Sequence, residues 1–291
     1  MLPLEKRIVL IPIDFTEITL FALDQGIKLA NVIGAEITII NVIEDHGFFN
    51  KYITNKEESE FKKKLEKDLE TLSKEKSAKS GVKINYMIAH GKIYEKINEV
   101  AEMLGATLVL MGTSGSMGIM KFIGSNTLRV IRESKIPVIS IKGTKFQDGL
   151  SSILLPLDLT KETREKVAKA VWLSKLYGNV PIKVVSVSTS TEKTIKNKIK
   201  RQEIQVRDFL LQKGIECTTK MLGKAKGKTL AETIIGHAES VGAGMIVIMT
   251  QQETNISEMF IGSSAQAIIN GSEIPVMSVV PAPKVLSGVH L

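Results

Sequence analysis

The chain has 291 residues, of which 43% are hydrophobic and 24% are charged, and its formal net charge is +8. This length allows two domains of ordinary size, and the composition is typical of a folded globular protein rather than a disordered one. A single cysteine, Cys217, excludes an internal disulfide and a site built from several cysteines, and the four histidines are scattered. No apolar run approaches the roughly 18 residues of a membrane-spanning helix, and the start of the sequence has no signal-peptide pattern. We therefore expect a cytoplasmic protein with no membrane insertion and no built-in metal.

The excess of positive charge does not by itself indicate nucleic-acid binding. The densest groups of lysines lie in residues 56–79 and 193–207. In the first segment Phe61, Leu65 and Leu69 recur at helical spacing with charges on the other faces, which is typical of an amphipathic surface helix. Aromatic residues make up only 5% of the chain, and no platform of aromatic and basic residues for stacking bases is present. We expect no nucleic-acid partner.

In chain order, apolar strand-like runs alternate with helical patterns. Strands are predicted at 8–14, 36–43, 83–89, 107–112 and 137–142, and again at 153–158, 181–187, 216–222, 245–250 and 275–280. Helices are predicted at 16–33, 57–80, 93–104 and 125–133. Buried strands separated by helices of ten or more residues indicate parallel crossovers. The pattern predicts two tandem doubly wound α/β domains, each a five-stranded parallel sheet flanked by helices.

The two halves are copies of one pattern. Residues 7–45 align with 152–190, and residues 124–138 align with 262–276. A short polar joint with two glycines separates the copies. The predicted domains are residues 1–146 and 147–291.

The ends of the predicted strands point to a shared crevice in the first copy. In doubly wound sheets, ligands bind outside the carboxyl ends of the strands, where the strand order reverses. Asp14, Val42 and the glycine-rich loop after Leu110 all follow such ends. The Asp14 carboxylate could accept a hydrogen bond from a ribose hydroxyl or an adenine amino group.

The glycine-rich loop reads MGTSGSMGIMKFIGS at residues 111–125. Gly112 and Gly115 would let a bulky ligand approach the backbone. Gly124 and Ser125 open a predicted helix whose free N–H groups suit a phosphate, with Ser125 as the expected N-cap. Glycines at a strand-to-helix turn and a serine cap would also explain these residues without any ligand.

Three stretches, IPIDFTE, MGTSG and IGSNTLRVIRESKIPVISI, resemble the universal stress protein family, and the resemblance covers both halves. It implies a fold of the adenine nucleotide alpha hydrolase-like, Rossmann-like type. Many members of that family bind ATP through the motif G-x-x-G, about nine residues, then G-(S/T), so the resemblance also implies ATP binding. The resemblance assigns the nucleotide, with Mg²⁺ on its phosphates, to Pro12, Asp14, Val42, Met111, Gly112, Gly115, Gly124, Ser125 and Asn126.

Both copies depart from the family pattern. The first has eight residues between Gly115 and Gly124, one fewer than the pattern. In the second, alignment of the loop with MTQQETNISEMFIGS at residues 249–263 places Thr250 and Glu253 where the glycines stand. A side chain and a negative charge there would oppose phosphate binding. We therefore predict one adenine nucleotide per chain, ATP or another, in the first copy.

A second basic loop, LGKAKGKT at residues 222–229, nearly matches a P-loop, but Leu222 stands in place of the first glycine. We interpret it as a flexible basic loop. The alternative is that Lys224, Lys226 and Lys228 bring positive charge to an anion in the second crevice.

No catalytic triad, carboxylate pair or arginine finger is recognisable, so we expect a binding protein with at most slow ATP hydrolysis. The predicted function is that of a cytoplasmic stress-response protein, a nucleotide-responsive regulator with an unidentified protein partner. Two alternatives stay open: an interaction scaffold or transporter regulator that binds no nucleotide, and a slow ATPase.

Each copy ends in an apolar strand, residues 136–141 and 274–280, which alone would be an exposed sheet edge. In the family this strand commonly pairs in a dimer, so we expect the two halves to pair within one chain. A homodimer of whole chains is a further expectation.

Overall fold

The computed structural model describes residues 7–44, 55–113, 124–142, 149–157, 163–188, 190–250 and 261–280. The described part of the first half contains β1 (Arg7–Pro12), α1 (Glu17–Ile33), β2 (Ala35–Ile43), α2 (Asn55–Ser80), β3 (Ile84–His90), α3 (Ile93–Met103), β4 (Leu108–Thr113), α4 (Ser125–Glu133) and β5 (Val138–Lys142). The second half contains β6 (Ile153–Leu157), α5 (Thr163–Leu176), β7 (Ile182–Ser188), α6 (Lys193–Gln212), β8 (Cys217–Gly223), α7 (Leu230–Ser240), β9 (Met245–Met249), α8 (Ser263–Gly271) and β10 (Val276–Val279). The ten predicted strands and the four helices predicted in the first half are confirmed, and each of their ends lies within two residues of its predicted position. The proposed division at residues 146 and 147 lies outside the described residues.

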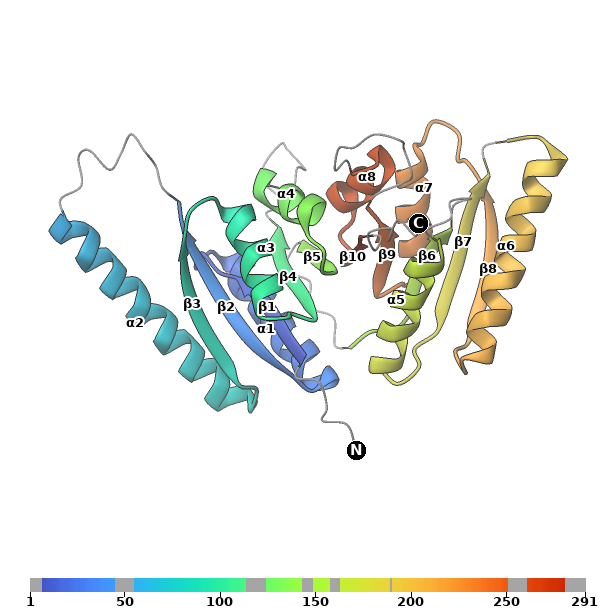
Figure 1. The fold of residues 1–291 in the computed structure, drawn as a ribbon. Helices are drawn as coiled ribbons and strands as arrows, with labels where there is room; N and C mark the ends of the chain where they lie inside the picture. Colours follow the sequence, from blue (N-terminus) through green and yellow to red (C-terminus); the bar gives the residue numbers. More distant parts are fainter. Residues whose placement is uncertain are drawn as a thin grey trace, which may run out of the picture.

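All ten described strands belong to one sheet in the order β3-β2-β1-β4-β5-β10-β9-β6-β7-β8 (Figure 1). Within each half, the strands of every adjacent pair are parallel, which confirms the predicted doubly wound fold. In the first half the order reverses between β1 and β4, where connections leave toward opposite sides. The second half repeats this reversal between β6 and β9. A crevice at the carboxyl edge is expected at both places.

The two halves join edge to edge through their last strands. β5 and β10 are antiparallel, and Ile139 lies opposite Met277 at the centre of the pairing. The buried Lys142 side chain crosses the joint, where its Nζ donates to the carbonyl of Asn270 at 2.8 Å. The predicted pairing of the two halves within the chain is therefore confirmed, and it covers both apolar edges that each half alone would expose.

Helices cover both faces of the sheet, as the near-continuous apolar strands require. One hydrophobic cluster lies beneath α1, α2, α5 and α6, and the other lies beneath α3, α4, α7 and α8. Each cluster contains residues from both halves. The helices α2 and α6 lie at the two outer ends of the sheet (Figure 1).

The strand register gives a more accurate alignment of the two glycine-loop segments. Val9 pairs with Leu108, and its counterpart Ile153 pairs with Met245. Counting four residues along β4 and β9 from these pairs makes Met249 the counterpart of Gly112. The prediction that Thr250 replaces Gly112 is therefore wrong by one residue.

Two buried threonines support this register independently. Thr113 Oγ1 donates to the carbonyl of Ile141 at 3.1 Å, and Thr250 Oγ1 donates to the carbonyl of Val279 at 3.2 Å. Thr250 is thus the counterpart of Thr113. The loop of the second half is one residue longer than that of the first, and an alignment on the shared FIGS end concealed this difference. By the same count Gln252, rather than Glu253, takes the place of Gly115, and all three residues lie outside the described part of the chain.

Candidate functional site

A cavity opens at each reversal of strand order. The one in the first half has a volume of about 540 Å³, and the one in the second half has a volume of about 340 Å³. The cavity of the first half is bounded by the ends of β1, β2 and β4 and by the starts of α1, α3 and α4. Seven of the predicted site residues line it: Pro12, Asp14, Val42, Met111, Gly112, Gly124 and Asn126. Ser125 adjoins them without lining the cavity, and Gly115 lies outside the described residues. Residues that are up to 114 positions apart in sequence therefore meet in one crevice, as the strand ends predicted.

Asp14 is fixed by the turn that it begins. Its Oδ1 accepts hydrogen bonds from Thr16 N–H at 3.0 Å, Thr16 Oγ1 at 2.6 Å and Thr19 Oγ1 at 2.8 Å. Partial desolvation would raise the pKa of Asp14, but these hydrogen bonds outweigh it and hold the pKa below its ordinary value. Asp14 is therefore a carboxylate at neutral pH. Its Oδ2 accepts no hydrogen bond from the described residues, so it is the oxygen that a ligand could use.

The backbone next to Asp14 takes an unusual conformation. Phe15 has φ of 65°, in the left-handed region that a bulky side chain rarely adopts. Such strain persists only where surrounding contacts over-determine it, and it is most common at functional sites. Here it turns the chain sharply between β1 and α1, so that Asp14 remains at the cavity and α1 packs back on the sheet.

Gly112 has a structural role that the sequence did not reveal. A Cβ at this position would lie 2.5 Å from the carbonyl oxygen of Ile18 and 3.2 Å from Cβ of Ala22, both on α1. No real side chain tolerates such a contact, so glycine is required for α1 to pack against β4. Gly112 lines the cavity, as predicted. The packing of α1 is nevertheless sufficient to explain why this residue is a glycine, whether or not a ligand approaches its backbone.

Gly124 is different, because the protein itself does not require a glycine there. A Cβ would meet nothing within 4 Å, and φ is −55°. Gly124 is the N-cap of α4 and makes no side-chain capping bond, so the prediction that Ser125 is the N-cap is wrong by one position. The first backbone bond of the helix runs from Leu128 N–H to Gly124 O at 3.3 Å. The N–H groups of residues 125–127 therefore have no partner within the helix.

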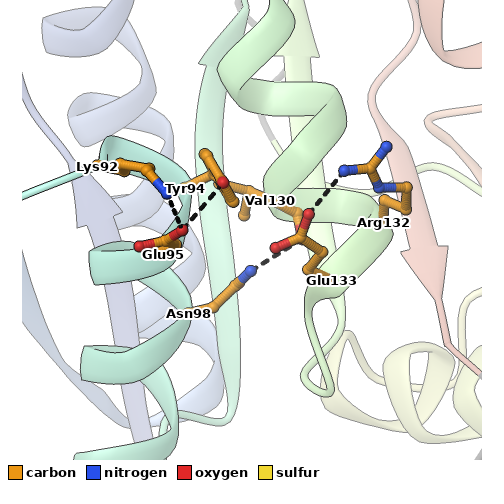
Figure 2. Close-up of polar contacts among 7 residues, drawn as sticks. All are labelled: Lys92, Tyr94, Glu95, Asn98, Val130, Arg132 and Glu133. Atoms are coloured by element: carbon orange, nitrogen blue, oxygen red, sulfur yellow. Dashed lines mark hydrogen bonds and ion pairs between the residues drawn. The ribbon is translucent and has the colours of Figure 1, made fainter. Parts of the chain in front are cut away.

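The helix α4 packs against α3, which also borders the cavity. Figure 2 shows Asn98 of α3 reaching the carbonyl of Val130 in α4, a hydrogen bond of 3.4 Å within the core. Arg129 of α4 lies over the ring of Tyr94 at 5.1 Å. Glu95 of α3 accepts from Tyr94 and from Lys92, the N-cap of α3, and Arg132 of α4 pairs with Glu133 (Figure 2). These contacts orient α4 without using its N-terminal N–H groups.

Several lining residues were not predicted from the sequence. Asn41 donates from Nδ2 to the carbonyl of Ile13 at 2.7 Å and ties the ends of β1 and β2 together. Thr19 is 9% exposed and holds Asp14. The remaining unpredicted residues of the lining are Ile13, Thr16, Glu17, Ile18, Ile40, Ile93, Ile97 and Thr127. Only the threonines at 16 and 19, which follow an aspartate just before a helix, carried a local signal.

The charged residues of this lining, within the described chain, are the carboxylates of Asp14 and Glu17. The described residues contain no group of three or more metal-ligating side chains, so Mg²⁺ would depend on the phosphates of a bound nucleotide. No described helix is both long enough and apolar enough to cross a bilayer.

The basic loop before α7 does not form a P-loop. Thr229 is the N-cap of α7, and its side chain is engaged with Glu232 in a capping box. Lys224, Lys226 and Lys228 are exposed and are not part of the lining of the second cavity. The structure thus favours the interpretation of this segment as a basic surface loop.

The model of the universal stress protein family matches residues 6–142 and again residues 150–280. The chain belongs to the universal stress protein family. It is a tandem member, since each match spans one five-stranded half, and the predicted family membership is confirmed.

Curated relatives match about one half of this universal stress protein. A universal stress protein from Methanocaldococcus jannaschii is 32% identical over 145 residues, which is 49% of this chain and 85% of the relative. Another from the same organism is 27% identical over 151 residues, 46% of this chain and 93% of the relative.

Among solved structures, a universal stress protein from Archaeoglobus fulgidus covers 96% of this chain and 100% of its own, with a TM-score of 0.77 and 21% identity. This likeness establishes the tandem fold. A shorter universal stress protein from Archaeoglobus fulgidus, solved in complex with dAMP, covers 44% of this chain and 96% of its own, with a TM-score of 0.37 and 22% identity.

Proposed function

We propose that the first half of this universal stress protein binds one adenine nucleotide, with the base and ribose at Asp14 and the phosphates at the N-terminus of α4. The observation that carries the proposal is that two groups line the same cavity: the carboxylate of Asp14, whose Oδ2 accepts no hydrogen bond from the described residues, and the N-terminus of α4, which has no side-chain cap. Oδ2 of Asp14 is an acceptor for ribose hydroxyls or the adenine amino group. The N–H groups at residues 125–127 and the positive end of the α4 dipole suit a phosphate.

The size and lining of the cavity support the same proposal. Its volume of 540 Å³ falls within the range of about 300–1,000 Å³ that is usual for cofactor and small-molecule sites. Ile13, Ile40, Ile93 and Ile97 supply apolar surface for a flat base. Gly124 leaves open space beside the helix start, where a side chain would obstruct a phosphate.

We infer a regulatory role for the nucleotide rather than a catalytic one. Hydrolysis requires a residue that positions or activates water and a cation that stabilises the developing charge. The described lining offers two carboxylates, and Asp14 is already engaged through one oxygen. The bound nucleotide would then report the state of the cell to a protein partner whose identity remains open, and a cytoplasmic location remains a prediction of the sequence.

Equilibrium titration with ATP, AMP and dAMP tests the proposal. Asp14→Asn keeps Oδ1 as an acceptor but replaces Oδ2 with an amide, so affinity should fall at least ~10-fold, about 1.4 kcal/mol. Asp208→Asn, which changes an exposed carboxylate paired with Arg207 in the second half, is the matched control and should bind normally. Absence of binding at millimolar ATP would favour the interaction scaffold instead. Phosphate release that Asp14→Asn abolishes would make the protein an ATPase and refute the regulatory role.

A further inference from the structure

The helix α6 carries an unbalanced positive charge. It contains six basic and two acidic residues, whereas α2, its counterpart in the first half, contains eight basic and seven acidic ones. Of the two acids in α6, Glu203 is buried and Asp208 is paired with Arg207 at 2.9 Å. Glu192, the N-cap of the helix, adds one exposed carboxylate. The surface of α6 therefore remains strongly positive when every one of these acids is counted.

Five cations of α6 have no ion-pair partner among the described residues. All five are exposed, and they are Lys193, Lys196, Lys198, Lys200 and Arg201. Lys200 favours the charged form of the buried Glu203 without forming an ion pair with it. On α2, by contrast, Lys62 and Lys74 each pair with a glutamate one turn earlier, at 2.7 and 2.6 Å. The lysines of α2 are thus partly neutralised within their own helix, and those of α6 are not.

The chain that follows α6 has a charge of the same sign. Residues 192–232, from the N-cap of α6 to the first turn of α7, contain eleven basic and five acidic residues. The corresponding residues 55–95 of the first half contain ten and eight. Of the acids after α6, Glu216 is exposed and Glu232 is engaged in the capping box of α7. The basic loop before α7 lies at the carboxyl edge of the sheet, where α6 begins, and adds to the positive field there.

Apolar side chains share one face of α6 with these cations. Ile204 is 40% exposed and Leu211 is 53% exposed, although both are large hydrophobic residues. Steps of three or four residues, which keep side chains on one face of a helix, connect them to basic residues. We call this face the ridge of α6, and its residues are Lys193, Lys196, Lys200, Ile204, Arg207 and Leu211. The buried stripe at Ile199, Val206 and Leu210 faces the sheet instead.

The ridge fits a partner surface that is both anionic and apolar. The strand order ends at β8, and α6 lies at this outer end of the molecule (Figure 1). Phosphates of a nucleic acid would pair with the lysines but would leave Ile204 and Leu211 in water. The surface of a bilayer with anionic lipids accommodates both kinds of side chain, because its head groups attract lysines and the boundary of its acyl chains accepts apolar groups.

We propose that α6 binds the surface of a bilayer that contains anionic phospholipids. The lysines of the ridge lie at the head groups, and Ile204 and Leu211 lie at the boundary of the acyl chains. The helix lies along the surface and does not cross it, since no described helix is long and apolar enough to span a bilayer. This interaction is additional to nucleotide binding in the first half and does not depend on it.

Sedimentation of the full chain with lipid vesicles tests the partner. The neutral vesicles consist of phosphatidylcholine, and the anionic ones of equal parts phosphatidylcholine and phosphatidylglycerol. We expect at least ~10-fold tighter binding to the anionic vesicles at ~0.1 M salt, and loss of this preference at ~0.5 M salt, where the charges are screened. Equal binding to both kinds of vesicle, or binding to neither, would overturn the proposal. Tighter binding to single-stranded RNA than to the anionic vesicles would also overturn it and would identify a nucleic acid as the partner.

Substitution of lysines tests whether the charge acts through the ridge. Lys193→Gln, Lys196→Gln and Lys200→Gln together should weaken binding to the anionic vesicles ~100-fold, since each lysine near such a surface contributes about 5-fold. The matched control removes the same charge from exposed positions of α2, by changing to glutamine Lys63, Lys64 and Lys67. It should bind within ~3-fold of wild type. Equal losses in the two variants would show that the net charge acts and not the ridge.

Substitution of the apolar residues distinguishes a bilayer from a purely electrostatic partner. Ile204→Ser with Leu211→Ser keeps every charge and should weaken binding to the anionic vesicles at least ~10-fold. Met103→Ser, at a residue of α3 that is 64% exposed, is the control and should bind as wild type does. Unchanged binding in the Ile204 and Leu211 variant would contradict the proposal. Asp14→Asn should leave vesicle binding intact, which separates this test from that of the nucleotide site.

Discussion

Two glycines that border the same loop should respond differently to substitution by alanine: Gly112→Ala should lower the stability of the protein, and Gly124→Ala should lower its affinity for ATP. At Gly112 an added Cβ would lie 2.5 Å from Ile18 O and 2.9 Å from Ile18 C, so either α1 or β4 must shift. Overpacking of this kind costs about 1–3 kcal/mol. For a protein of this size that corresponds to a fall of about 2–5 °C in the midpoint of thermal unfolding for Gly112→Ala.

At Gly124 the added Cβ meets nothing within 4 Å, and the backbone conformation is one that alanine adopts readily. Gly124→Ala should therefore leave the stability of the ligand-free protein within about 0.5 kcal/mol of wild type. If phosphates lie at this helix start, the methyl group obstructs them and ATP affinity falls at least ~10-fold.

Thermal unfolding by circular dichroism, without nucleotide, measures the first effect, and calorimetric titration with ATP measures the second. Gly236→Ala, another glycine whose added Cβ would meet nothing within 4 Å, is the control: because it lies inside α7 it should raise the midpoint slightly, and it should leave ATP affinity unchanged. An unchanged midpoint in Gly112→Ala would refute the argument that this glycine serves the packing of α1. Full ATP affinity in Gly124→Ala would refute the phosphate position.

The joint between the halves and a buried acid give further predictions. Lys142→Met leaves the carbonyl of Asn270 without its donor and should lower the free energy of unfolding by about 1–3 kcal/mol in urea titrations. Lys135→Met removes only an exposed ion pair with Glu102 and should cost less than about 1 kcal/mol; equal losses would contradict the role of Lys142. Burial raises the pKa of Glu203, so its ionisation opposes folding as pH rises above the unfolded pKa of about 4.3. Glu203→Gln should accordingly stabilise the protein at pH 7 and have little effect below pH ~4, and a benefit independent of pH would show that charge is not the cause.

The cause at Glu203 is desolvation, which its neighbours relieve only in part. Ser186 and Lys200 each favour the charged form. No hydrogen bond of ordinary geometry joins Ser186 to Glu203, however, since Ser186 Oγ and Glu203 Oε1 are both without partners in the described structure. The net effect is therefore an elevated pKa.

The alternation of apolar runs and helical patterns was sufficient to predict the sheet, because buried parallel strands leave a signal that depends only on composition and period. The crevice followed from the same logic, since strand ends meet at one edge whatever the side chains are. Asn41 could not be predicted, because a single polar residue in a strand shows neither its face nor its partner. The same holds for Ser186, the counterpart of Asn41 in β7. Its buried hydroxyl without a hydrogen-bond partner is noticed only when the two strands are compared in the structure.

The glycines show a second limit. A glycine after a strand looks the same whether its missing side chain makes room for a ligand or for a helix, and only the position of Ile18 distinguishes the two at Gly112. The register error at Thr250 arose similarly, because the shared FIGS ends conceal a one-residue difference that lies within the loop. The strand pairing determines the correct alignment, because Gly112 pairs with Ile141 in the first half and Met249 pairs with Val279 at the equivalent place in the second.

The most direct test of the account is a crystal structure of the whole chain grown with ATP and Mg²⁺. We expect one nucleotide per chain, in the first crevice, with a ribose hydroxyl or the adenine amino group at Asp14 Oδ2 and the phosphates at the N–H groups that begin α4. The second crevice, narrowed by Met249 and Lys166, should hold no nucleotide. ATP bound in the second crevice, or in the first with its phosphates away from Gly124, would contradict the account.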